Sequence, residues 1–185
     1  MFDRLRSYSF FSTIIFIAMI FSSTYANADS KQEINTKVKA ALKEFKKTVP
    51  GASLFLQKSR GILVFPEVVK AGLGFGGEYG EGALLINNKT HAYYSTASAS
   101  VGFQFGVQVK SVIIVFLQSK ALKTFRNSSG WKAGVDGSVA LVKIGTGKSI
   151  DSATHNKPIV GFIFANKGLM YNLTLEGSKF TKIVR

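Results

Sequence analysis

The sequence predicts an α+β fold, with a curved, mainly antiparallel β-sheet or partial barrel, an N-terminal amphipathic helix and short additional helices. Alternating apolar segments follow one another directly along most of the chain, and such strands pair antiparallel. A glycine-rich segment in the first half can bend the sheet. One segment near the N-terminus shows a helical rather than a strand period.

The predicted N-terminal helix begins at Lys31, because Ser30 and Glu33 have the spacing of a capping box. Its apolar residues recur at helical spacing and form one stripe: Ile34, Val38, Ala41, Leu42, Phe45 and Val49. The opposite face carries four lysines: Lys39, Lys43, Lys46 and Lys47. Basic amphipathic helices of this kind can lie on anionic membranes.

The same stripe can instead pack on the sheet of the protein itself, with the lysines in solvent. Exposing Leu42 and Phe45 would forfeit about 1.5–3 kcal/mol of burial each. We therefore expect the helix to be docked in the resting state. Pro50 and Gly51 should end it, and a second short helix is expected at 52–58.

The glycine-rich segment follows a predicted strand at 61–65, which Pro66 should stop. From residue 72 to 82 glycine occupies most even positions, so one face of a strand here would be nearly bare. A bend, or the close approach of another backbone or a ligand, is the usual reason. The match to a G-x-G-x-x-G fingerprint at Gly72, Gly74 and Gly77 is interpreted as accidental, because no helix pattern follows it.

The remaining elements are predicted from turn residues and alternation. Asn87-Asn88 indicates a hairpin turn, followed by a return strand from His91 and a long alternating segment at 95–110 that should bend near Gly102 or Gly106. A further strand is expected at 112–117, then a helix capped by Ser119 that runs to residue 125. Final hairpins are predicted at 131–144, 159–165 and 169–175, with turns at 145–147 and 166–168.

The N-terminus has the layout of a secretory signal peptide, with Arg4 and Arg6 before an apolar run at 10–21 and the small-residue motif Ala26-Asn27-Ala28. Cleavage after Ala28 is preferred over an uncleaved anchor. We expect a signal peptide at 1–28, a single domain at 29–185, and a periplasmic or secreted location with peripheral membrane association. The chain contains no cysteine, which excludes disulfides, thiolate metal sites and a lipidated cysteine.

The net charge of +14, of which residues 1–28 contribute +1, favours anionic partners. Phospholipid headgroups, nucleic acid, lipopolysaccharide and acidic polymers all fit this charge, and export makes nucleic acid a poor partner. A basic, soluble protein without such a partner has the same composition.

No residues assemble into a recognisable catalytic or metal site, so we predict no catalytic residues, no metal and no cofactor. The two histidines, His91 and His155, lie in or beside predicted turns. Glu78 and Glu81 are three apart and should face opposite sides of a strand. Asp136 is interpreted as a turn or bulge residue.

Four blocks of the chain together resemble the SYLF domain family: GILVFPEVVKAGLGFGGEYGEGALL, YYSTASASVGFQFGVQ, FRNSSGWKAGVDGSVALV and PIVGFIFANKGLMYNLTLEGSKFTKI. The resemblance covers about 33–183. The family includes bacterial exported proteins and the lipid-binding module of eukaryotic SH3-containing actin-patch regulators. The resemblance therefore implies a lipid-binding domain, which in the eukaryotic members binds phosphoinositide-containing membranes partly through an N-terminal amphipathic helix and basic residues. The predicted helix at 31–49 occupies the matching position, so the resemblance implies lipid contact by its four lysines.

The preferred hypothesis is an exported, non-catalytic module that binds anionic phospholipid membrane surfaces through the basic helix and a basic surface. A small envelope hydrolase is the alternative, and convergence of Glu78, His91 or Asp136 in a cleft would favour it. A protein-binding envelope scaffold is a third possibility.

Overall fold

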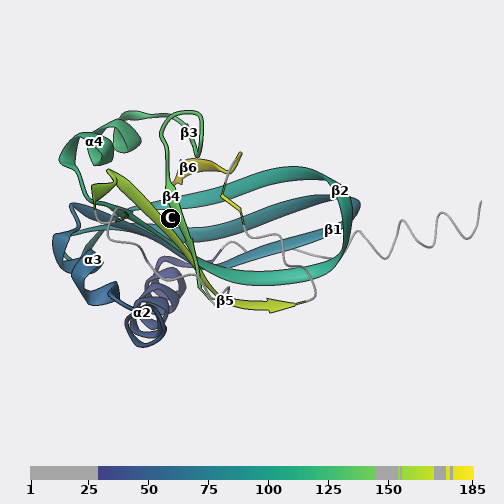
Figure 1. Ribbon diagram of the computed structural model, residues 1–185, viewed down its shortest axis with the longest axis horizontal. Helices are drawn as coiled ribbons and strands as arrows, with labels where there is room; N and C mark the ends of the chain where they lie inside the picture. Colours follow the sequence, from purple (N-terminus) through teal and green to yellow (C-terminus); the bar gives the residue numbers. More distant parts are fainter. Residues whose placement is uncertain (1–28, 145–153, 155, 169–173, 176) are drawn as a thin grey trace, which may run out of the picture.

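In the computed structural model, the described part of the chain forms an α+β domain of three helices and six strands with a curled sheet, a half-barrel that confirms the predicted fold class (Figure 1). The structure describes residues 29–144, 154, 156–168, 174–175 and 177–185. The predicted signal peptide, the turn at 145–147, His155 and most of the hairpin at 169–175 lie outside these residues.

Helix α2, Lys31–Thr48, begins where the capping box predicts. The Ser30 side chain accepts a hydrogen bond from the backbone N–H of Glu33 at 3.2 Å. A short second helix, α3, spans Ala52–Lys58 after the left-handed Gly51. The third helix, α4, spans Ser119–Asn127, but its N-cap is Gln118 and no side chain caps it. The expectation that Ser119 caps this helix is therefore wrong.

Two very long strands dominate the sheet. Strand β1, Gly61–Ile86, pairs antiparallel with β2, Lys89–Phe116, along its whole length. A tight turn joins them, with both Asn87 and Asn88 at positive φ, as predicted. Figure 1 shows this hairpin extending away from the helices and turning back at its far end.

The expectation that Pro66 stops a strand is wrong, because β1 continues through it. The register of pairing with β2 shifts between Phe65 and Val68. The proline therefore lies in an irregular stretch where the strand does not need a backbone N–H to donate to its partner. The hydroxyl of Ser111 donates to the Pro66 carbonyl at 2.7 Å, which ties this irregularity to β2.

The predicted bend in the long return segment is confirmed, although 95–110 and 112–117 belong to one strand rather than two. Between the pairs Leu73–Phe105 and Phe75–Val101 the register shifts, and Gly106 has a φ of 123°. At this bend the hairpin folds over, so that the two halves of β1 approach each other. A Cβ at Gly80 would lie 2.6 Å from the carbonyl oxygen of Glu67, which explains why this face is bare.

The other edge of β2 carries the rest of the sheet. Strand β6, Lys179–Ile183, pairs with the start of β2, and β5, Ile159–Gly168, pairs with its end. Strand β3, Trp131–Lys132, extends the sheet beyond β6, and β4, Ala140–Lys143, lies beside β5.

The predicted final hairpins are wrong in their pairing. Strand β4 is parallel to β5, and β3 pairs with β6 rather than with β4. Strand β5 also continues through the turn expected at 166–168, with Ala165 at a positive φ. Among the described strands the sheet is mainly antiparallel, as predicted, and β4 with β5 is the parallel pair.

The core consists of two apolar layers, one on each face of the sheet. Inside the curl, residues of β1, β2 and β5 pack with α4 and with the buried Trp131. On the outer face, α2 and α3 cover the sheet with Ile34, Val38, Ala41, Phe45, Val49, Ala52 and Phe55. The Phe45 ring meets Phe162 edge to face at 4.9 Å. Helix α2 is therefore docked, as expected from its apolar stripe.

Candidate functional site

The predicted lipid-binding residues lie on the solvent side of α2. Docking of the apolar stripe on the sheet turns the other face outward, and all four side chains are exposed: Lys39, Lys43, Lys46 and Lys47. Among the described residues, none of the four forms an ion pair. We call this surface the basic face of α2. It is a row of cations available to an anionic surface.

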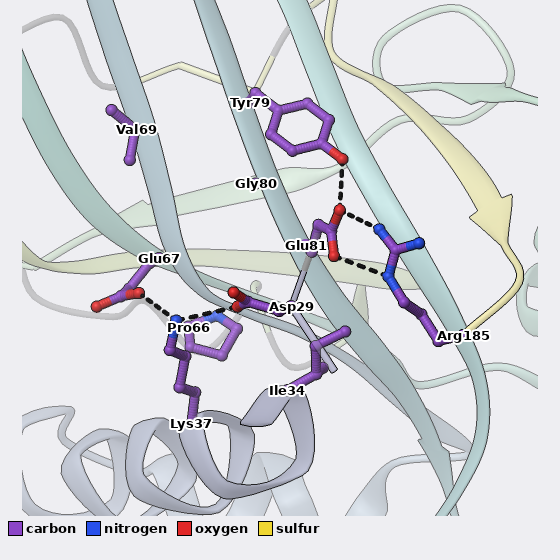
Figure 2. Close-up of a pocket in the computed structure, with 10 residues that line it drawn as sticks. All are labelled: Asp29, Ile34, Lys37, Pro66, Glu67, Val69, Tyr79, Gly80, Glu81 and Arg185. Atoms are coloured by element: carbon purple, nitrogen blue, oxygen red, sulfur yellow. Dashed lines mark hydrogen bonds and ion pairs between the residues drawn. The ribbon is translucent and has the colours of Figure 1, made fainter. Parts of the chain in front are cut away.

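A pocket of about 320 Å³ lies where the start of α2 meets β1 and the C-terminus of the chain (Figure 2). The Nζ atom of Lys37 reaches three carboxylates from one position on the helix. It lies 3.0 Å from Asp29, 3.0 Å from Glu33 and 3.1 Å from Glu67. The hydrogen bond to Asp29, followed by those to Glu33 and Glu67, raises the pKa of Lys37 despite partial desolvation.

On the other side of this pocket, Glu81 joins two side chains. The Tyr79 hydroxyl donates to Glu81 Oε1 at 2.6 Å, and Arg185 donates to both carboxylate oxygens, through Nε at 3.0 Å and through Nη2. Partial burial and the hydrogen bond to Glu81 raise the pKa of Tyr79 to about 12. The hydrogen bond to Glu81 also raises the pKa of Arg185.

The charge of this pocket makes it a poor site for an anion. Among the described residues, three carboxylates line it together with two cations, Lys37 and Arg185, and carboxylates bind both cations. We interpret the cluster as a structural connection that fixes the start of α2 and the chain end to β1. The basic face of α2 lies outside it, and none of its four lysines lines the pocket.

The residues that would have favoured a hydrolase have separate surroundings. Glu78 is buried and pairs with Lys110 at 2.8 Å, whereas Asp136 accepts a hydrogen bond from the backbone N–H of Lys132 at 2.6 Å. His91 is exposed on β2. Within the described residues, no group of three or more His, Asp or Glu is placed to hold a metal ion. In the same part of the chain, no helix has the length and apolarity to cross a bilayer.

Sequence reasoning missed the ion pair between Lys110 and Glu78. Both side chains are buried, and Lys110 Nζ also donates to the carbonyl oxygen of Thr174 at 3.3 Å. The alternation of a strand does not show which of its two faces is the interior, so it gave no reason to expect these two side chains to be buried together. Arg185 was also missed, because it meets Glu81 across 104 residues of sequence.

The fold and this surface define a class of protein, namely a small α+β domain with a curled sheet and a basic covering helix. Within that class, residues 97–183 match the family model of Ysc84, described as Las17-binding protein actin regulator. This match confirms the resemblance to the SYLF domain family expected from the sequence, and it extends from within the first half of β2 to the end of β6. A comparison with curated proteins finds no match.

Proposed function

We propose that this protein is a non-catalytic binding module for anionic phospholipid membranes, and that it acts at an envelope membrane after export. One observation carries the proposal: α2 is docked by its apolar stripe and presents Lys39, Lys43, Lys46 and Lys47 together to solvent. The resemblance of the chain to a lipid-binding family supports the same function.

The docked helix determines the character of the binding. Because Ile34, Val38, Ala41 and Phe45 are in the core, they are not available to a bilayer in this state. The lysines act through charge, at about 1 kcal/mol for each residue near an anionic surface. We therefore expect reversible binding that weakens strongly as the salt concentration rises.

The test is cosedimentation of the protein with vesicles of neutral lipid and with vesicles that contain anionic lipid. Lys43→Glu plus Lys47→Glu should lower binding to the anionic vesicles by at least about tenfold, because two attractive charges become repulsive. Lys120→Glu plus Lys123→Glu on α4 changes the net charge equally and is the matched control. Equal binding of wild type to both vesicles, or an equal loss in both variants, would contradict the proposal.

Protein binding is the second candidate function, because the family description names a protein partner, Las17. It predicts that vesicles of either kind leave the protein in the supernatant. Export is tested separately, by sequencing the N-terminus of the protein recovered from cells. We expect the first residue to be Asp29, and retention of residues 1–28 would contradict this expectation.

A further inference from the structure

The outer face of the hairpin bend carries apolar side chains that no element of the described chain covers. We call these residues the apolar strip: Val69, Ala71, Leu73, Phe75, Tyr79, Ala97, Ala99, Val107 and Val109. The exposed fraction is 67% for Leu73, 78% for Phe75 and 55% for Val107. The strip includes residues of both strands that lie side by side, because Val69 pairs with Val109, Ala71 with Val107 and Tyr79 with Ala97. An exposed apolar surface of this kind marks an interaction site.

The interior of the same bend is polar. Lys70, Glu78, Gln108 and Lys110 alternate with the residues of the apolar strip and are buried. An ordinary sheet of a soluble protein has the opposite arrangement, with apolar side chains inside and polar ones in water. Strands that contact lipid on one side alternate with apolar residues outward and polar residues inward. The bend has this second pattern.

The apolar strip continues a face that is covered elsewhere. Val107 and Val109 lie on the same side of β2 as Ile113 and Val115, which pack against the helices. Helix α2 therefore covers one part of this face and leaves the part nearest the bend open.

The charges around the strip indicate which partner fits it. Lys167 pairs with Val109 on one side and Lys179 pairs with Ala97 on the other, and both lysines are exposed. The carboxylates nearest the strip, Glu67 and Glu81, are bound by Lys37 and Arg185. A second copy of the strip would bring two lysine borders together, whereas an anionic bilayer attracts them.

We propose that the apolar strip inserts among the acyl chains of an anionic bilayer, with Leu73 and Phe75 deepest and with Lys167 and Lys179 at the headgroups. This inference rests on the proposed membrane function and adds a hydrocarbon contact to the charge contact of α2. The insertion is shallow. Among the described strands β1 pairs only with β2, so its other edge has unpaired backbone groups, and such groups do not enter hydrocarbon.

Tryptophan fluorescence tests the position of the strip. The sequence has one tryptophan, the buried Trp131, which supplies a constant background. Phe75→Trp places a second one in the strip. The control is Val135→Trp, because Val135 is similarly exposed, at 75%, in the turn after β3. With anionic vesicles whose acyl chains carry bromine, we expect the added emission to shift to the blue and be quenched in Phe75→Trp, and to stay unchanged in Val135→Trp.

Sedimentation of the same samples separates the two proposals. If Phe75→Trp sediments with the vesicles but the emission of its added tryptophan is not quenched, the insertion is overturned and the charge-based function stays intact. Protein that stays in the supernatant would overturn the proposed function, and the insertion with it. Quenching in both variants would also contradict a specific role of the strip.

A second pair of variants measures the contribution of the strip to binding. Phe75→Ser should weaken binding to anionic vesicles by at least about tenfold, because it removes one inserted aromatic side chain. Val135→Ser, the matched control, should leave binding unchanged. Binding of Phe75→Ser that equals that of the wild type would overturn the proposal. A wild-type protein that is a dimer without lipid, and that Phe75→Ser converts to a monomer, would also overturn it, because the strip would then join two copies of the chain.

Discussion

The two halves of the β1–β2 hairpin have the same backbone pairing and opposite relations to water. In the half near the helices, both faces are buried, so that neighbouring residues such as Leu63 and Val64 enter different core layers. In the half at the bend, the inward side chains include Lys110 and Glu78, and the outward ones include Phe75. Burial in this sheet therefore follows the covering elements rather than the alternation of the strand. Where no helix covers the outer face, an apolar residue stays exposed.

The largest expected difference between the halves comes from two phenylalanines. Phe45→Ala should lower the free energy of unfolding by about 3–5 kcal/mol, because it opens a cavity between α2, Phe162 and Phe164. Phe75→Ala should change it by no more than about 0.5 kcal/mol, because its side chain is already in water. Denaturant unfolding without lipid measures both. If Phe45→Ala left stability unchanged, α2 would not be docked in solution.

The polar interior of the bend gives the next largest effect. Glu78→Gln should cost about 3 kcal/mol, the lower part of the range for breaking a buried ion pair, since Lys110 keeps its hydrogen bond to Thr174. Adding Lys110→Met should recover much of this loss, because no buried charge then lacks a partner. A double variant less stable than Glu78→Gln alone would show that the lysine stabilises the bend by itself.

A smaller effect is expected at the start of the helix that covers the outer face. Ser30→Ala removes the cap on the backbone N–H of Glu33 and should cost about 1 kcal/mol. Thr48→Ala, near the other end of α2, is the control, because its hydroxyl donates to a carbonyl, Glu44 O, instead of satisfying a free N–H. Thermal unfolding compares the two, and an equal change in both would argue against the capping interaction.

The smallest effect concerns Tyr79, where the apolar strip meets the pocket. Its pKa of about 12 lies above the unfolded value of 10, so the folded state holds this proton more tightly. The resulting stabilisation is complete below pH 10 and is lost as the pH rises toward 12. Relative to wild type, Tyr79→Phe should therefore be less stable at pH 9, by less than about 1 kcal/mol, with the gap closing by pH 12. Unfolding curves at several pH values check this, and a gap independent of pH would contradict it.

The elements that the sequence predicted correctly depend on local signals. The capping box at Ser30 and the apolar stripe give α2 its bounds and its docked face, and paired asparagines give the hairpin turn. Strand pairing depends on contacts between distant residues, which explains why the parallel partner of β4 and the short β6 were missed. An alternation of Lys and Phe was present at 179–183, but five residues carry too little signal to show where they pair.

For the candidate site, the four lysines of α2 were predicted from spacing, and the structure places them in solvent together. Their lipid contact stays a prediction. The apolar strip was visible as one face of an alternating pattern, but alternation does not distinguish the inner face from the outer one. That distinction comes from the way the hairpin folds over at its bend, which depends on the whole of β1 and β2.

The close approach of the two halves of β1 also has a consequence for solubility. The edge of β1 that faces away from β2 has no partner among the described strands, and free edges of this kind can recruit other chains. Gly80 and Gly82 let the second half of the strand lie directly against the backbone of Glu67 and Val64. A side chain at either glycine would hold the halves apart and open this edge. The bare face would thus protect the protein from aggregation, and Gly82→Val should precipitate at concentrations where the wild type stays in solution.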